Sequence, residues 1–310
     1  MPGVGLAFFE DSIVMAFAEK TRGTHAKHGS GTLLRGCAGA PVPAYSPYGT
    51  LPAAEFKNAL AEILSGSLPR VKDVVISIPD IAVKAVVLEF IELPGNRQEA
   101  EEVIKWKALR GFSVRPEDCV VGYQTVGTSN GKKITPFSKG GLGGIKVFAA
   151  IADRKIIEGY EDAVSEAGLG VSVVGIHSLN ALNLLSEALP DETEGSFFAV
   201  TASKSFFSVM AVRDGAVDFY RCKETGEGED VSQHIEATFA SYKGKNPDAE
   251  MDRAYILGSV PALAGSAGGF SGVQLKEISV SRLISLGTGV SIDGIPLLGV
   301  ISAAGAAAAR

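Results

Sequence analysis

The chain has 310 residues, of which 46% are hydrophobic and 21% are charged, and its formal net charge is -6. This length suggests two domains, and the composition allows a sizeable buried core. A negative net charge without a cluster of lysines or arginines argues against a general nucleic-acid binder.

The beginning of the chain predicts a hairpin, loops, a helix and a strand. Residues 4–20 alternate loosely between apolar and polar, which indicates a hairpin that turns at 10–12. The Gly/Pro/Ser-rich stretch 29–52 suggests loops around a short strand. Residues 53–64 place apolar side chains on one helical face, and the β-branched run 71–78 predicts a strand.

A small α/β unit is expected next. Residues 83–93 predict a strand, and Asn96 is a plausible N-cap for a helix over 97–110, whose early acids and late bases suit the helix dipole. Trp106, the single tryptophan, is expected to be a core anchor of this unit.

The same unit continues with two strands, 119–126 and 145–152, and with an amphipathic helix that starts near Ile156. The Gly/Lys-rich stretch 129–144 between the strands suggests a hairpin loop, because its glycines precede no helix start.

The second half of the chain begins with a strand at 171–176 and a helix at 179–188. The segment 190–195 is the clearest boundary between two lobes. Residues 197–222 predict a hairpin around Asp214-Gly215, a pair that favours a type I′ turn. This hairpin and the one at 4–20 each open a lobe, which indicates a weak internal duplication.

The rest of the chain predicts a helix at 231–243, a strand at 254–257 and an Ala-rich helix at 295–309. This last segment is too short for a confident membrane span of about 20 residues, so we expect it inside the protein. The first residues, MPGVGLAFFEDS, lack the basic start of a secretory signal. With unpaired Cys37, Cys119 and Cys222, expected to be buried reduced thiols, these features predict a cytoplasmic protein.

No spacing argues for catalysis. The chain has no GxxxxGK[ST] phosphate loop, no GxGxxG after a strand and no GxSxG elbow. His25 and His28 are interpreted as a solvated loop pair, since no carboxylate or cysteine lies near them in sequence. No metal or cofactor is therefore expected.

Four blocks together resemble the PilM family of type IV pilus assembly proteins, which is similar to the cell-division protein FtsA. They are VVISIPDIAVKAVVLEFIELP (74–94), EAEEVIKWKALRGFSVRPEDCVVGYQTV (99–126), KVFAAIADRKIIEGYEDAVSEAGLGVSVVGIHSLNALNLL (146–185) and the hairpin at 197–222. They span most of the chain in the family's order. The resemblance implies a bilobed, actin-like α/β fold that duplicates a ribonuclease H-like core.

The resemblance also implies the division of the chain. A first lobe, subdomain 1A, would comprise 1–78, completed by 171–190 and 295–310. An inserted subdomain, 1C, would comprise 79–170. A second lobe, 2A with a reduced 2B region, would comprise 195–294, because only one good helix is expected between 225 and 252.

Nucleotide-binding members of such folds hold phosphate and metal through DxG turns in both hairpins and adenosine at a Gly-rich strand end. The positions that correspond to these elements here are Ala7, Phe9 and Val14 in the first hairpin, Thr201 and Ser203 in the second, and Gly258, Ser259 and Val260 at the strand end. With no carboxylate at either turn, the resemblance predicts a pseudo-ATPase.

PilM-like proteins are similar to adaptors that bind the tail of an inner-membrane partner, PilN, in a groove between 1A and 1C. The expectation is a cytoplasmic scaffold that binds a PilN-like tail and other pilus platform components, without ATP hydrolysis. Candidate groove residues are Val83, Val86, Leu88, Phe90 and Tyr123, although each is equally well interpreted as a core residue.

Two alternatives stay open. The first is an active actin-like ATPase or carbohydrate kinase with a metal held by residues such as Asp11 or Asp153. The second is a related adaptor, similar to the cytoplasmic part of GspL in type II secretion or to the pilus accessory protein MshI. These relatives should carry a membrane span after the globular region.

Overall fold

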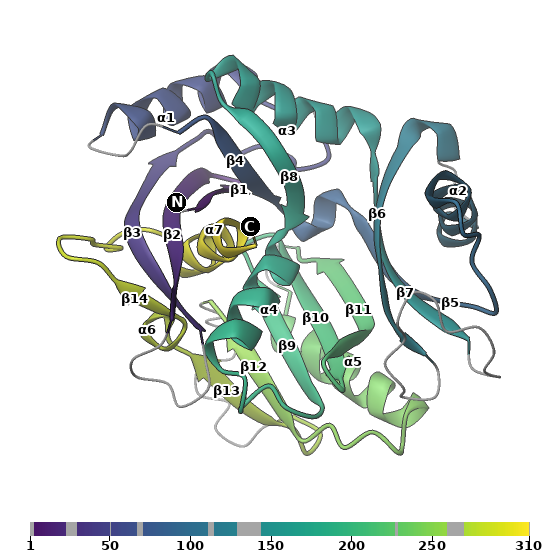
Figure 1. Cartoon of the computed structure of the whole chain (residues 1–310). Coiled ribbons are helices and arrows are strands. Elements are labelled where there is room, and N and C mark those ends of the chain that lie inside the picture. Colours follow the sequence, from purple (N-terminus) through teal and green to yellow (C-terminus); the bar gives the residue numbers. More distant parts are fainter. Residues whose placement is uncertain are drawn as a thin grey trace.

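The computed structural model describes residues 3–22, 30–49, 51–66, 71–110, 115–128, 144–226, 229–258 and 270–309. Three β-sheets organise this part of the chain (Figure 1). Their arrangement brings the beginning and the end of the described chain together at the centre of the molecule.

The first sheet has six strands. In spatial order they are β14 (Ile284–Leu286), β3 (Ser30–Pro41), β2 (Ser12–Arg22), β1 (Gly3–Phe9), β4 (Asp73–Ile78) and β8 (Gly170–Ile176). β1, β2 and β3 are antiparallel neighbours, whereas β4 and β8 continue the sheet parallel to β1.

The second sheet repeats this pattern with five strands. In spatial order they are β11 (Ala216–Glu224), β10 (Phe206–Arg213), β9 (Phe197–Ala202), β12 (Arg253–Leu257) and β13 (Gln274–Ile278). Three antiparallel strands are again followed by two parallel ones. The weak duplication expected from the two hairpins is therefore confirmed as a repeated strand order.

The third sheet has three antiparallel strands in the order β5 (Lys84–Phe90), β7 (Ile145–Asp153) and β6 (Cys119–Thr128). Helix α2 (Arg97–Ala108) packs on one face, and the predicted cap is confirmed, because the Asn96 side chain accepts a hydrogen bond from the backbone N–H of Gln98. Phe90 and Ile104 belong to the small core between the helix and this sheet.

Helices cover both faces of the first sheet (Figure 1). They are α1 (Ala53–Ser65) and α3 (Arg154–Glu166) on one face, and α4 (His177–Ala188) and α7 (Leu297–Ala308) on the other. Helix α5 (Val231–Lys245) packs on the second sheet, where the ring of Phe239 stacks on that of Phe198. The short elements are η1 (Asp80–Ala82), η2 (Pro116–Asp118) and α6 (Val280–Leu283).

Strand β1 is buried on both faces, and its alternation decides what each face packs against. The Phe8 ring lies 5.2 Å from that of Phe56 in α1 and 5.1 Å from that of Tyr160 in α3. Gly3 and Gly5 point to the opposite face, towards α7.

Helix α7 approaches its neighbours so closely that side chains are excluded. A Cβ atom on Gly5 would lie 1.9 Å from the carbonyl oxygen of Ala303, and one on Gly305 would lie 2.1 Å from the carbonyl oxygen of Asn180. The alanines and glycines of the expected C-terminal helix are thus a packing requirement, and the helix is confirmed as a buried one. Among the described residues, no helix has the length and apolar character needed to cross a bilayer.

The expectation that Trp106 anchors a core is wrong. Its side chain is 71% exposed on α2. The buried face of this helix contains Ala100, Ile104 and Ala108, and a residue two positions after Ile104 points to the other side.

Two strand predictions are also corrected. The stretch 29–52, interpreted as mostly loops, contains the long strand β3, because pairing with β2 satisfies its backbone over eleven residue pairs. The run 197–212 forms two strands that turn at 203–205, so it is itself a hairpin.

Two elements pack against parts of the structure outside the subdomain range in which they were expected. β14 lies within 195–294 but pairs with β3 of the first sheet. Helix α3 lies within 79–170 but packs on α1 and β8.

Some predicted features lie outside the described residues. They are the expected loop 129–143, His25, His28, Ser259 and Val260. The described cysteines are unpaired, with Cys119 buried and the other two half-buried.

Gly5→Ala is expected to lower the free energy of unfolding by about 2–3 kcal/mol or more, because a methyl group there meets the backbone of α7. Gly244→Ala in α5 is the matched control. Nothing lies within 4 Å of its Cβ position, so the alanine should raise stability by up to about 1 kcal/mol. Urea unfolding followed by circular dichroism measures both. Equal effects would contradict the close-packing account.

Candidate functional site

The tips of the two lobe-opening hairpins contact each other. The hydroxyl group of Ser203, in the β9–β10 turn, donates a hydrogen bond of 2.9 Å to the Glu10 carboxylate in the β1–β2 turn. The hydroxyl group of Ser205 donates to the same carboxylate oxygen, and the Lys204 ammonium pairs with Asp11. The last pair is exposed and contributes little, whereas the shared Glu10 oxygen joins the two sheets directly.

The first-hairpin positions singled out by the resemblance are packed inside the protein. All three residues, Ala7, Phe9 and Val14, are buried. Phe9 and Val14 lie close to the first turn of α7, and Ala7 lies on the face of β1 that is turned to this helix. A Cβ atom on Gly299 of α7 would lie 2.7 Å from Val14 Cγ2 and 3.4 Å from a Phe9 ring carbon.

Of the second-lobe positions, Gly258 meets the same helix turn. Thr201 is buried, and its hydroxyl oxygen is without a hydrogen-bond partner among the described residues. A Cβ atom on Gly258 would lie 3.0 Å from Leu298 Cβ, and the φ of +99° at this position also favours glycine. The structure thus brings Phe9 and Val14 of the first lobe and Gly258 of the second together around the start of α7. Ser203 stands apart at the hairpin tips.

His177 completes this packed region. Its ring stacks on that of Phe9, with centroids 4.2 Å apart and planes 5° from parallel. Nε2 lies 2.7 Å from the carbonyl oxygen of Phe8, which assigns the proton to Nε2, and Nδ1 accepts from the Ser77 hydroxyl at 2.9 Å. Burial lowers the pKa of His177 to about 3, so the imidazole is neutral at pH 7.

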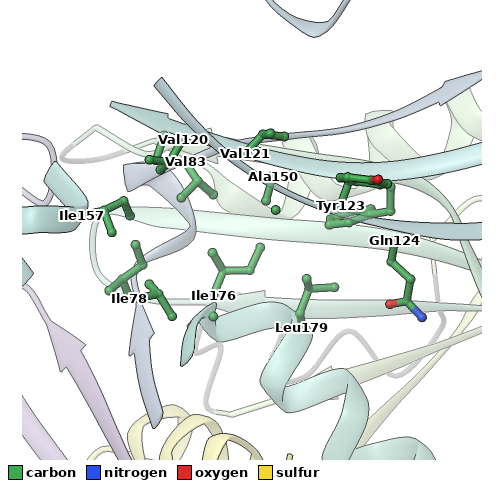
Figure 2. A pocket seen from close by; sticks show the side chains of 15 residues that line it. Ile78, Val83, Val120, Val121, Tyr123, Gln124, Ala150, Ile157, Ile176 and Leu179 are labelled. Carbon is green, nitrogen blue, oxygen red and sulfur yellow. The ribbon is translucent and has the colours of Figure 1, made fainter. Parts of the chain in front are cut away.

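A groove with a volume of about 330 Å³ lies between the first and third sheets. Figure 2 shows Val120 and Tyr123 of β6 opposite Ile176 at the end of β8 and Leu179 of α4. β6 and β8 each stand at the end of their sheet's strand order. The groove therefore runs between two strand edges that have a sheet neighbour on one side only.

The lining of this groove is almost wholly apolar. It comprises Ile78, Val83, Val120, Val121, Gly122, Tyr123, Gln124, Phe148, Ala150, Ala152, Ile157, Val174, Gly175, Ile176 and Leu179. None of these side chains is charged, and the polar ones, Tyr123 and Gln124, are neighbours on β6. An apolar groove beside strand edges suits an extended, uncharged peptide segment, which can offer main-chain hydrogen bonds and alternate side chains.

Of the predicted groove residues, Val83 and Tyr123 are among those that line it, although Tyr123 pairs with Ala149 and also packs against the small core under α2. Val86, Leu88 and Phe90 do not line it. They pair across the sheet with Ala149, Val147 and Ile145 and so point towards α2, on the opposite face from Phe148 and Ala150. A strand's alternation shows that one face is exposed, but only the neighbouring elements decide which.

Sequence reasoning missed most of the lining residues, including Val120, Ala150, Val174 and Leu179. Their strands and helix were expected, but nothing in the local pattern marks β6 and β8 as edge strands. The alternative metal residues are also engaged elsewhere, since Asp11 pairs with Lys204 and Asp153 caps α3 by accepting from the Lys155 N–H. The described residues contain no group of three or more side chains suited to a metal ion.

Comparison with solved structures places this architecture among known folds. The PilM chain of a structure described as a PilM–PilN type IV pilus biogenesis complex superposes with a TM-score of 0.74 and 18% identity, over 98% of this chain and 97% of that chain. The chain has a PilM-like, actin-like fold. No family model matches the sequence, and no curated protein matches it either.

Two further structures share this PilM-like fold less closely. The cytoplasmic domain of EpsL, an inner-membrane component of the type II secretion system of Vibrio cholerae, has a TM-score of 0.50 at 12% identity, over 98% of this chain and 94% of that chain. A Bacteroides thetaiotaomicron protein with an actin-like ATPase fold and unknown function has a TM-score of 0.50 at 13% identity, over 96% and 95%.

The buried histidine predicts a specific pH dependence. Because the folded pKa lies near 3 and an unfolded histidine titrates near 6.5, the stability from neutral His177 is complete above pH 6.5 and falls as pH drops towards 3. Between pH 7 and pH 5 the wild type should lose about 2 kcal/mol from this group. His177→Gln should lack this component. Urea titrations at both pH values measure it, and identical pH slopes would refute it.

Proposed function

We propose that this protein is a cytoplasmic docking platform of a type IV pilus or related secretion machine. It binds an extended tail segment of a PilN-like inner-membrane protein in the groove between β6 and β8. The observation that carries the proposal is the uncharged groove between two strand edges.

The chemistry of the groove supports a peptide partner. Its side chains bury apolar surface, while Gly122 leaves the backbone of β6 accessible. Nothing lies within 4 Å of the Cβ position of Gly122. The solved PilM structure is described as a complex with PilN, which favours a partner of that type.

We further propose that the protein does not hydrolyse ATP. Mg²⁺ in such a site needs oxygen ligands, and Ala7 and Thr201 provide no carboxylate. The Phe9 ring is stacked on His177, and the first turn of α7 contacts Phe9, Val14 and Gly258. A phosphate group would have to displace these side chains.

Which machine the protein belongs to, a type IV pilus or a secretion system, depends on the partner that it binds. The similarity to PilM is greater than that to the EpsL domain, which favours a pilus-type partner. In either machine the protein would associate with the membrane through this partner.

Val120→Asp tests the groove. A carboxylate introduced into this apolar lining should weaken binding of the N-terminal peptide of the PilN-type protein from the same genome by at least about tenfold, because the charge is desolvated when the peptide is bound. Val103→Asp, on the exposed face of α2, makes the same change outside the groove and should leave affinity unchanged. Isothermal titration calorimetry measures both. Equal affinities for all three proteins would place the partner elsewhere.

Thermal unfolding with millimolar MgATP tests the absence of nucleotide binding. A ligand present at about 100 times its Kd stabilises the folded state by roughly 2.7 kcal/mol, which gives an easily measured shift in melting temperature. We expect no shift. A Mg²⁺-dependent shift would instead favour an active actin-like ATPase.

A further inference from the structure

A buried carboxyl group lies directly behind the groove. Asp80 begins the short helix η1 after β4, and its side chain is fully buried. Burial raises the pKa of the Asp80 carboxyl, and hydrogen bonds from Ser178 and Tyr220 oppose part of that rise. Such a group is costly to bury, so its partners determine where it can lie.

The first partner is the amino-terminal turn of α4. The backbone N–H of Ser178 lies 3.3 and 3.2 Å from the two Asp80 carboxylate oxygens, and the Ser178 hydroxyl donates to Oδ1. The residue at the N-cap position, Ile176, has no side chain that can accept a hydrogen bond. Asp80 therefore caps α4 from another element, where the helix dipole favours a negative charge.

The second partner comes from the second sheet. The hydroxyl group of Tyr220 on β11 donates a 2.7 Å hydrogen bond to Asp80 Oδ1, and Ser208 of β10 lies 3.3 Å from the same hydroxyl. The Tyr220 ring also packs edge-on against Phe148, with centroids 5.7 Å apart. Phe148 is itself a groove residue.

These contacts reach both walls of the groove. Ile78, which precedes η1, and Ile176 and Leu179, which flank Ser178, line the first-sheet wall. Val83, which follows η1, lies beside Val120 on the third-sheet wall (Figure 2). A movement of the Asp80 carboxyl would therefore shift residues on each side of the groove. Tyr220 connects the same carboxyl to the second sheet, which supplies none of the groove-lining residues.

We propose that Asp80 is a positioning residue for the groove, which holds its walls in place and couples groove occupation to the second sheet through Tyr220. This inference rests on the proposed peptide function of the groove. Because coupling between two sites is reciprocal, a segment bound in the groove stabilises β10 and β11, and loss of the Tyr220 contact weakens the bound segment.

Tyr220→Phe is the decisive variant, because it removes the hydroxyl group and keeps the ring on Phe148. Tyr255→Phe is the matched control. Tyr255 is also buried and donates its hydroxyl proton at 2.6 Å to the backbone carbonyl of Glu192, whereas the Tyr220 hydroxyl donates to Asp80. Asp80→Asn, which keeps an acceptor oxygen for Ser178, is the conservative change at the carboxyl itself.

The experiment measures peptide affinity and hydrogen exchange in the full chain, with the N-terminal peptide of the PilN-type protein from the same genome as the probe. In the wild type, the peptide should slow exchange in β10 and β11 as well as in the groove strands. Tyr220→Phe should bind about 5- to 20-fold more weakly and lose the protection of β10 and β11. Tyr255→Phe should behave as the wild type. Asp80→Asn should have an affinity and a protection between those of the wild type and Tyr220→Phe.

The free protein provides a second, peptide-independent readout. Tyr220→Phe should speed amide exchange in the first turn of α4, because Asp80 loses a contact that holds it at that turn, whereas Tyr255→Phe should not. Unchanged exchange there, or wild-type affinity and protection with the peptide, would overturn the inference while leaving the groove proposal intact. A wild-type protein that does not bind the peptide would refute the proposed partner, and exchange at α4 would still decide the role of Asp80.

Discussion

The close approach of α7 to its neighbours is the constraint on which the rest of the structure depends. Gly3 and Gly5 let the helix backbone contact β1, and Gly305 lets it contact α4. The first turn of the same helix reaches β12 of the second sheet at Gly258. One buried helix thus packs against both large sheets, and small residues are required wherever it touches backbone, since interiors are packed too densely to absorb extra atoms.

Around this helix, the three sheets are joined by a few polar contacts between elements far apart in sequence. Glu10 joins the hairpin tips, Asp80 joins η1, α4 and β11, and Lys146 of β7 pairs with Asp218 of β11. Of these residues, Glu10 directly follows Phe9, one of the positions where the resemblance suggested a nucleotide site. In the proposed function, these contacts hold the sheets together, and the partner binds in the groove between β6 and β8.

The predictions that the structure confirms are those that depend on residues close together in the sequence. The alternation in residues 4–20 predicted the first hairpin, Asn96 predicted the start of α2, and the single helix expected between 225 and 252 is α5. The predictions that were wrong concerned which face of a helix or strand is buried and which element it packs against. Trp106 was placed in a core, and Val86, Leu88 and Phe90 were considered for the groove, whereas these three strand residues face α2.

By itself, the sequence determined the main helices, the first hairpin, the Asp214-Gly215 turn and the small residues of the last helix, because these follow from periodicity, turn chemistry and backbone propensity over short distances. Only the tertiary structure decided that β6 and β8 are sheet edges, that their apolar faces form a groove, and that Asp80 is buried behind it. Each of these properties depends on contacts between residues far apart in sequence, so no local pattern records them.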